Sequence, residues 1–192
     1  MTWMASAMRA AQAQLETATH NLANVASDGF RRVRSSVALT SRGLVARETP
    51  DDAQGGIRET GRALDLALLG PGAFRVEGGE TRNGGFVRSR DGILTDGRGR
   101  PVLGEHGPIH LSGTATIAAD GTIREGARIV DRLPLLPGTT VRSGALESSS
   151  VDAIGETLAI LTAQRAFETA QKTLVAIDQT REKAVNDVVR LK

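Results

Sequence analysis

The sequence has no cysteine and no tyrosine, and aromatic residues make up only 3% of it. The missing cysteines exclude a disulfide framework, a thiolate metal site and a thiol nucleophile. Because there is one tryptophan and there are four phenylalanines, any hydrophobic core has to consist mainly of leucine, isoleucine, valine and alanine. We therefore expect a thin core.

Long hydrophobic runs are missing as well. No apolar stretch approaches the roughly 20 residues that a membrane-spanning helix needs, so we expect no membrane insertion. The N-terminus lacks the cationic head, apolar middle and small-residue cleavage site of a Sec-type signal peptide. We therefore expect the chain to stay in the cytoplasm or to be exported by another route.

An excess of charge of one sign is also lacking, because 24 basic residues face 22 acidic ones, for a net charge of +2. A dedicated nucleic-acid-binding protein usually concentrates its positive charge, so this balance argues against nucleic acid as a partner. The cluster Arg31, Arg32 and Arg34 is the local exception. It is either a solvated arm, which is the more common case, or a contact for phosphate groups.

Signatures of catalysis and of cofactor binding are missing too: there is no G-x-S-x-G, P-loop or H-E-x-x-H motif. His106 and His110 are four residues apart, but a turn-like Gly-Pro pair separates them and no third ligand is near. Residues 70–72 have the composition of a phosphate cradle, but a turn between strands is favoured because no helix is expected to follow. We therefore expect no enzyme, no cofactor and no metal.

The first 25 residues carry a clear structural pattern. Apolar residues recur every three or four positions, which is the spacing of a coiled-coil seam. The members of this N-terminal stripe are Met1, Met4, Met8, Ala11, Leu15, Ala18, Leu22 and Val25. We expect a helix that ends near residues 27–29, with Gly29 as the left-handed residue after it.

A second stripe runs through the C-terminal region, after Ser149 and Asp152, which resemble a capping box. Its members are Ile160, Ala163, Phe167, Ala170, Leu174, Ile177, Ala184, Val188 and Leu191, interrupted by Arg181. An isolated amphipathic helix is marginal in water. Both terminal helices therefore need partners.

Between the two helices, the hydrophobic period changes to two and Asn-Gly, Asp-Gly and Gly-Pro turn signals recur at short intervals. This pattern predicts a compact antiparallel β-domain. The predicted fold class is α+β: long N- and C-terminal helices form a coiled-coil-like pair, with a small antiparallel β-domain between them. The predicted segments are an N-terminal assembly helix over 1–29, an extended arm over 30–60, the β-domain over 61–143 and a C-terminal assembly helix over 144–192.

The two stripes have two explanations. Amphipathic helices usually bury their apolar face in their own domain, so the two helices could pair within one molecule. The small β-region offers little surface for two long helices, which favours assembly between molecules. A self-contained α+β enzyme or sugar-binding domain, with its helices packed on its own sheet, is the competing interpretation.

Several segments also match, in order, a known set of motifs. HNLANVASDGFRR is similar to NNLANVNTPGFKR, LDLALLGPGAF to LDVAIxGxGFF, and TRNGGF to TRxGxF, followed by DGIL. GALE, followed by Ser150 and Val151, resembles GxLExSNV, and AQRAFE resembles AQRAYE. These motifs belong to the flagellar axial family, the rod and hook proteins of the bacterial flagellum, and the chain resembles its proximal or distal rod proteins.

The resemblance implies a structural subunit of the basal-body rod, without catalysis. Such a subunit leaves the cell without a cleaved signal peptide, through the flagellar type III export apparatus, and lies at the periplasmic basal body. The terminal helices of many copies, and of other flagellar axial proteins, are then expected to pack as coiled-coil layers of an axial tube. This tube transmits torque from the motor to the hook, and the β-domain faces outward.

Residues on and beside the stripes are the candidates for this homo-oligomeric interface. Asn21 and Asn24 lie beside the N-terminal stripe, and their amides could fix the register between neighbouring helices. Alternatively, they cap the helix end near Gly29. The candidate interface residues are Met4, Met8, Ala11, Leu15, Ala18, Asn21, Leu22, Asn24, Val25, Leu158, Leu161, Gln164, Arg165, Phe167, Leu174, Ile177 and Val188.

Overall fold

The computed structural model describes residues 2–41 and 43–190; the side chains of residues 2 and 185–190 lie outside the described part. Within this part, the chain is α+β, with an N-terminal helix, a C-terminal helix and small antiparallel sheets between them, as predicted. It divides into two compact units. The helical unit consists of Met1–Ala23, Val33–Asp51 and Asp152–Lys192, and the β-unit of Asn24–Arg32 and Asp52–Val151.

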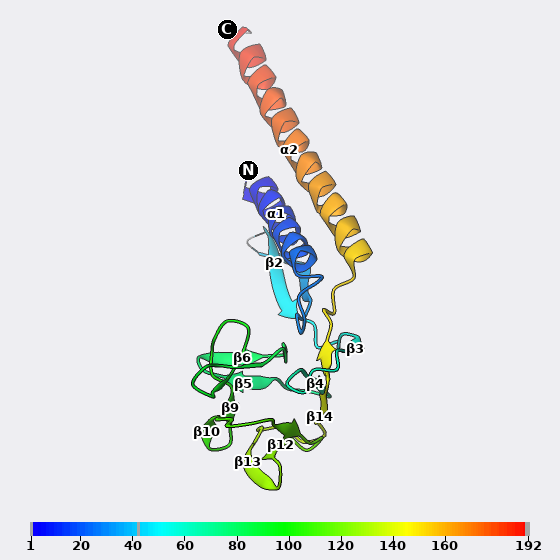
Figure 1. Cartoon of the computed structure of the whole chain (residues 1–192). Helices are drawn as coiled ribbons and strands as arrows, with labels where there is room; N and C mark the ends of the chain where they lie inside the picture. Colours follow the sequence, from blue (N-terminus) through cyan, green and yellow to red (C-terminus); the bar gives the residue numbers. More distant parts are fainter. Residues whose placement is uncertain (1, 42, 191–192) are drawn as a thin grey trace. The chain divides into compact units, whose positions relative to one another are not determined.

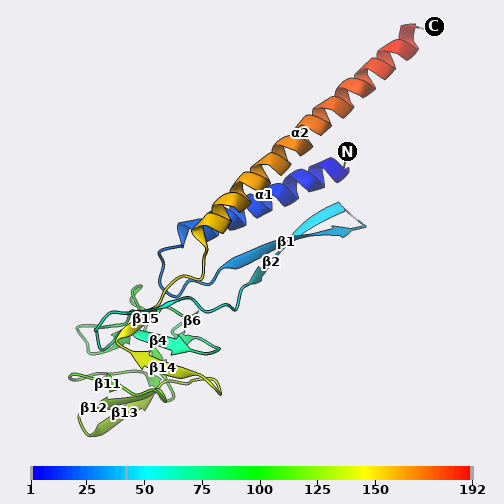
Figure 2. The ribbon, with the colours of Figure 1, turned by 90° about the vertical axis from the view of Figure 1, so that its right-hand side faces the viewer.

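The helical unit contains helix α1 (Thr2–Ala23), strands β1 (Val33–Thr40) and β2 (Gly43–Pro50), and helix α2 (Ala153–Arg190). The two helices lie side by side and run in opposite directions, and the β1–β2 hairpin lies along α1 (Figures 1 and 2). At 1.5 Å per residue, the 22 residues of α1 and the 38 of α2 span about 33 and about 57 Å. The C-terminal part of α2 therefore extends beyond α1.

The helix boundaries differ slightly from the sequence prediction. Helix α1 ends at Ala23, so Val25 lies in the turn that follows. Gly29 has the expected positive φ, 69°, but it lies six positions beyond the helix end. Helix α2 is capped by Asp152 alone, whose Oδ1 accepts the Ile154 N–H at 3.1 Å. The predicted capping box with Ser149 is wrong, because the Ser149 hydroxyl instead accepts the Val151 N–H.

The segment after α1 pairs with itself, which the interpretation of residues 30–60 as an extended arm did not predict. Strands β1 and β2 are antiparallel, with Val33 opposite Pro50 and Thr40 opposite Gly43. Each strand has eight residues, and an isolated two-stranded hairpin is at best marginally stable. Contact with α1 supplies the additional packing that the hairpin needs.

The β-unit contains thirteen short strands among the described residues. They are β3 (Ile57–Glu59), β4 (Leu66–Leu69), β5 (Phe74–Val76), β6 (Gly79–Thr81), β7 (Val87–Arg88), β8 (Leu94–Thr95), β9 (Leu103–Gly104), β10 (Gly107–Pro108), β11 (Thr116–Ile117), β12 (Thr122–Glu125), β13 (Arg128–Arg132), β14 (Thr140–Ser143) and β15 (Ala145–Glu147). Strands β3 and β4 pair with β15 and β14, so the segment that enters the unit lies beside the segment that leaves it. The other strands form consecutive hairpins and one three-stranded sheet, β11–β12–β13.

The core of the β-unit consists of aliphatic residues and two phenylalanines. The rings of Phe74 and Phe86 meet edge to face, with centroids 5.0 Å apart. Leu66, Leu94 and Ile123 belong to the same cluster and are fully buried. Each such side chain contributes about 1.5–3 kcal/mol when it leaves water, so this small unit has a core of its own.

No helix in the described part of the chain has both the length and the apolar character needed to cross a membrane.

Candidate assembly surface

The buried surface of the helical unit consists of small side chains. Within the described residues, every buried hydrophobic residue of this unit is an alanine. These residues are Ala10, Ala11, Ala18, Ala163 and Ala170. Alanine permits close approach, but it removes little apolar area from water. The packing within this unit is therefore energetically weaker than the leucine-rich core of the β-unit.

Several large apolar side chains of the helical unit are exposed instead. Ile154, Leu158 and Leu161 on α2 are 75%, 58% and 47% exposed. Their spacing of four and three residues places them on one helix face, which we call the α2 outer face. The other large exposed apolar residues of the unit are Trp3, Val37, Leu39, Val45 and Val175. Large exposed apolar side chains that share a face, as on the α2 outer face, are typical of protein–protein contacts.

The candidate interface residues are distributed over both buried and exposed surfaces. Ala11, Ala18 and Asn21 are buried. The partly buried ones are Met4, Met8, Leu15, Leu22, Asn24, Phe167, Leu174 and Ile177. The exposed ones are Val25, Leu158, Leu161, Gln164 and Arg165. The side chain of Val188 lies outside the described part. Contact of these residues with another subunit stays a prediction.

Asn21 holds the start of the hairpin against α1. Its side chain is buried; its Nδ2 donates to the Val33 carbonyl oxygen at 2.7 Å and its Oδ1 accepts the Val33 N–H at 2.9 Å. The amide is therefore engaged within the protomer, which competes with the predicted role of Asn21 between helices. Asn24 accepts a hydrogen bond from the Ser27 hydroxyl at 3.1 Å, in the turn after α1.

The other end of the hairpin is also fixed to α1. The Ser6 hydroxyl accepts the Leu44 N–H at 3.1 Å. Gly43 lies so close that a β-carbon there would be 2.4 Å from Ser6 Oγ. Because Asn21 and Ser6 are four helical turns apart, polar contacts hold the hairpin along most of α1.

In the β-unit, three motif segments meet at one place, which we call the motif junction (Gly29–Arg32, Arg82–Asn83 and Glu147–Ser150). The Gly29 N–H donates to the Glu147 carbonyl oxygen at 2.6 Å, and the Ser150 N–H donates to the Phe30 carbonyl oxygen at 3.0 Å. A β-carbon on Gly29 would lie 2.3 Å from the Asn83 nitrogen. The junction therefore requires glycine for its backbone conformation and for the close contact.

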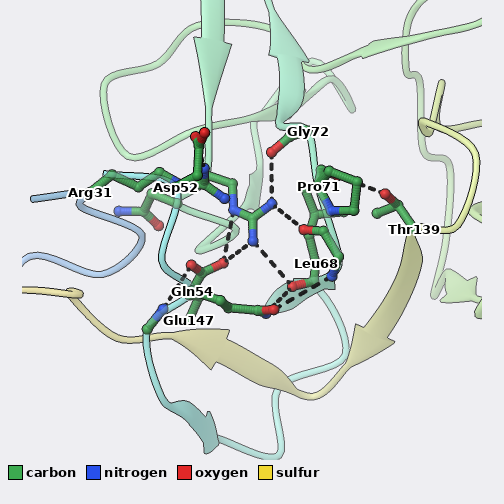
Figure 3. A network of polar contacts seen from close by, with 12 residues as sticks. Arg31, Asp52, Gln54, Leu68, Pro71, Gly72, Thr139 and Glu147 are labelled. Carbon is green, nitrogen blue, oxygen red and sulfur yellow. Dashed lines mark hydrogen bonds and ion pairs between the residues drawn. The ribbon is translucent and has the colours of Figure 1, made fainter. Parts of the chain in front are cut away.

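A buried ion pair lies at the centre of the motif junction. The side chains of Arg82 and Glu147 are 4% and 1% exposed, and Arg82 Nη2 lies 2.7 Å from Glu147 Oε2. Arg82 Nη1 also donates to the carbonyl oxygens of Gly70 at 2.9 Å and Gly72 at 2.7 Å. Glu147 Oε1 accepts the Gly55 N–H at 3.2 Å, so both charges are bonded on several sides (Figure 3). Such a pair is costly to break, because the remaining partner is left charged and buried.

The charged groups of the β-unit have the properties of structural ion pairs. Burial raises the pKa of Asp65, but hydrogen bonds from Arg62 and Thr60 and the charges of Arg62 and Arg58 outweigh it, so this pKa lies below its usual value. The resolved pKa shifts of Asp96, Asp120 and Asp131 are downward as well. A general acid needs a raised carboxyl pKa. Among the described residues, no three His, Asp or Glu side chains gather as a metal ion would require.

Sequence reasoning missed the pairing of Arg82 with Glu147. Both residues lie in the motif segments, but 65 positions separate them. The available signal was a charged residue in each of two segments that otherwise consist of glycine, apolar and small polar residues. That signal indicates that each charged residue has a specific role, but it does not show that the two residues pair with each other.

The chain thus combines two amphipathic terminal helices, which have exposed large apolar side chains, with a β-unit that has its own core and ion pairs. Comparison with known proteins identifies the family. Residues 142–187 match the family model described as "Flagellar basal body rod FlgEFG protein C-terminal". The chain is 30% identical to the flagellar basal-body rod protein FlgF of Escherichia coli (strain K12) over 240 aligned positions, which cover 95% of each chain.

Two further relatives support the same assignment. FlgF of Caulobacter vibrioides is 30% identical, over 93% of this chain and 91% of the relative. The rod protein FlgG of Bacillus subtilis is 26% identical, over 94% and 96%. The chain therefore belongs to the flagellar basal-body rod protein family, in its FlgF/FlgG class.

Proposed function

We propose that this protein is a structural subunit of the bacterial flagellar basal-body rod that assembles with copies of itself and with other axial proteins through its terminal helices. The observation that supports the mechanism is the packing of the helical unit: its fully buried apolar residues are alanines, while several of its large apolar side chains, Leu158 and Leu161 among them, are exposed to water. A folded monomer gains little from such an arrangement. Neighbouring subunits that cover the exposed side chains would supply the missing burial.

The interface we propose includes the α2 outer face and the candidate residues beside the two helix stripes. Leu158 and Leu161 provide large apolar contacts, and Gln164 and Arg165 adjoin them as polar groups on the same exposed surface. The paired helices would then pack against those of neighbours in coiled-coil-like layers around the axis of the rod. Torque would pass from the motor to the hook through these helix contacts.

The remaining parts of the proposal concern location and export. The subunit would reach the periplasmic basal body through the flagellar type III export apparatus, without a cleaved signal peptide. It would act without catalysis, cofactor or nucleic acid. The names of the relatives, which are rod proteins, support the basal-body location.

A triple variant tests the assembly role of the α2 outer face. Ile154→Ser, Leu158→Ser and Leu161→Ser together remove most of its apolar surface, and we expect the monomer to fold with an unchanged free energy of unfolding. In a strain that lacks the wild-type gene, this variant should yield few basal bodies with complete rods by electron microscopy, and little motility.

A matched control uses exposed apolar residues of the β-unit, Val87→Ser and Ile129→Ser, which are 46% and 57% exposed in the wild type. Rods should form normally with this double variant. Equal rod formation by both variants would contradict the assignment of the interface to α2. Normal motility in the deletion strain would contradict the rod function itself.

A further inference from the structure

One pocket in the β-unit is lined by two features that the sequence suggested as weak candidates for anion binding: the arginine cluster, through Arg31, and the turn of residues 70–72. This Arg31 pocket has a volume of about 300 Å³ and is lined by Arg31, Asp52, Gln54 and residues 70–72. The arginine cluster and the Gly-Pro-Gly turn are 39 positions apart, counted from Arg31 to Gly70. Figure 3 shows these residues, with Arg31 and Asp52 on one side of the view and Pro71 and Gly72 on the other.

Arg31 is incompletely paired in this pocket. Its Nη1 lies 3.0 Å from Asp52 Oδ1, and its side chain is only 21% exposed, whereas that of Asp52 is 97% exposed. The Arg31 Nε is buried and has no hydrogen-bond partner among the described residues. A buried unpaired donor is unusual in a folded protein and calls for an explanation. Its charged partner among the described residues is a carboxylate that is almost entirely in solvent.

The pair Arg34–Asp51, in the helical unit, differs from the Arg31–Asp52 pair because the Nε of Arg34 has an acceptor. There Arg34 Nε donates to Asp51 Oδ2 at 2.8 Å, and Arg34 Nη2 also lies 2.8 Å from the same oxygen. The Arg34 side chain is 65% exposed, and its carboxylate partner is the more buried member. The Arg34 pair is therefore satisfied by its own chain, while the Arg31 pair leaves a donor without an acceptor.

We infer that the Arg31 pocket binds a small oxyanion, a carboxylate or phosphate group, and that Asp52 occupies the guanidinium only until this ligand arrives. A guanidinium fork binds such groups through two parallel N–H donors, and a turn of the Arg31 side chain toward the pocket would give the buried Nε its acceptor. Displacing an exposed carboxylate costs little, because exposed ion pairs contribute only about 0.2–1 kcal/mol. Arg82, a second guanidinium at the Gly70–Gly72 turn, is already bonded to Glu147 and to that turn. Arg31 is thus the cation available to a ligand.

The size of the pocket limits the ligand to a small anion or one side chain, because pockets for drug-sized ligands begin at about 300 Å³. Two sources share this chemistry: a free anion, and an aspartate or glutamate side chain of a neighbouring rod subunit. Anion binding itself is independent of the proposed rod function, since it is measured on the monomer. Only the second source depends on assembly.

The test is a titration of the isotope-labelled full chain, followed by NMR. Sodium phosphate and, separately, sodium acetate replace sodium chloride at constant ionic strength, and the Arg31 Nε–H and the Gly70 and Gly72 amide signals report binding. We expect saturable shifts in the wild type and none in Arg31→Gln. Asp52→Asn should tighten binding about two- to five-fold, the equivalent of losing one exposed competing pair.

Asp51→Asn is the matched control, because it removes the corresponding carboxylate beside Arg34 and should leave the Gly70 and Gly72 signals unchanged during the titration. Signals in Asp52→Asn that do not saturate, or shifts that persist in Arg31→Gln, would overturn the anion site. Binding of either phosphate or acetate supports it.

A second arm identifies the source of the anion. In the deletion strain, loss of rods with folded Arg31→Gln assigns the pocket to an acidic side chain of a neighbouring subunit, and normal rods assign it to a free anion. If rods form without this protein altogether, the rod function fails, while the NMR result on the pocket still stands.

Discussion

The two units of the molecule differ in which of their side chains they bury. The β-unit buries Leu66, Phe74 and Phe86 completely. Its first strands pair with its last strands, and the hydrogen bonds of the motif junction lie beside them. The helical unit buries alanines and leaves Leu158 and Leu161 in water. In the first, the interactions needed for folding are present within one molecule. In the helical unit, part of the large apolar surface is not buried within the molecule and can still contact another subunit.

Under the proposed function, this difference would separate the folding of the subunit from its assembly. If the large apolar residues of the helices were already buried within the monomer, little surface would be left for neighbours. If the β-unit relied on neighbours as well, the monomer would have no stable part. Substitutions should therefore act on monomer stability when they fall in the β-unit, and on assembly when they fall on the exposed helix faces.

The largest expected effect on stability is at the buried ion pair. Arg82→Met leaves Glu147 charged and buried without its partner, which should lower the free energy of unfolding of the β-unit by about 3–5 kcal/mol. Chemical denaturation of the full chain, with the ring signals of Phe74 and Phe86 as reporters of this unit, measures the change. The helix content of α2 is expected to change far less.

Two comparisons sharpen this prediction. Arg142→Gln breaks an exposed pair with Glu59 and should cost less than about 1 kcal/mol. The double variant Arg82→Met/Glu147→Leu removes both charges and should recover much of the lost stability. A single variant no more harmful than Arg142→Gln would show that the β-unit does not depend on this pair.

The next largest effect is expected at Gly29. In Gly29→Ala, the new β-carbon meets the backbone of Arg82 and Asn83 in a left-handed conformation. We expect a loss of roughly 2–4 kcal/mol, from backbone strain plus overpacking. Gly78→Ala has a similar φ, 79°, but no atom within 4 Å, so it should show the strain alone, about 1–2 kcal/mol. Equal losses at the two positions would exclude the close contact as a cause.

The comparison of units also explains which features were predictable from sequence. The helix stripes, the β-unit and the turn at Gly29 follow from local periodicity and from turn residues, which act over a few positions. The hairpin β1–β2 was missed because its alternation is irregular: exposure switches phase between Ser36 and Val37, both of which are exposed. Its stability also comes from α1, through Asn21 and Ser6, a contact that local pattern does not show.

The candidate site was also only partly predictable, because local periodicity is visible in the sequence and contacts between distant segments are not. The stripes locate apolar surface on the helices, but they do not show which side the protomer itself covers. Ala163 and Leu161 are two positions apart, yet one is buried and the other is exposed. The Arg82–Glu147 pair and the Arg31 pocket both depend on segments far apart in the chain, which only the fold brings together.

A smaller effect is expected where the helical unit depends on a polar contact. Asn21→Leu removes both hydrogen bonds to Val33, so the N–H and the carbonyl of Val33 lose their partner. This loss should destabilise the hairpin by about 1–3 kcal/mol. Hydrogen exchange at the Val33 amide should accelerate, while exchange in the β-unit stays unchanged. If Val33 stays protected, the hairpin does not need Asn21, and the interpretation of Asn21 as a contact between subunits regains support.

The smallest effect is a pH dependence confined to the β-unit. His106 Nδ1 lies 2.9 Å from Asp131 Oδ1, and this hydrogen bond, together with the negative charge of Asp131, raises the pKa of His106. A raised pKa in the folded state means that the protonated form is favoured by folding. The contribution to stability is therefore complete below the unfolded-state pKa, about 6.5, and is lost as the pH rises through the higher folded-state pKa.

His106→Gln removes this contribution, so the free energy of unfolding of the wild type should exceed that of the variant most at mildly acidic pH. The difference should shrink toward alkaline pH and stay small throughout, because the imidazole is exposed. His110→Gln, four residues away, serves as the matched control for the loss of an imidazole. A wild-type advantage that grew with pH would have the wrong sign for a protonated His106 paired with Asp131, and would mean that the contact acts through the neutral imidazole.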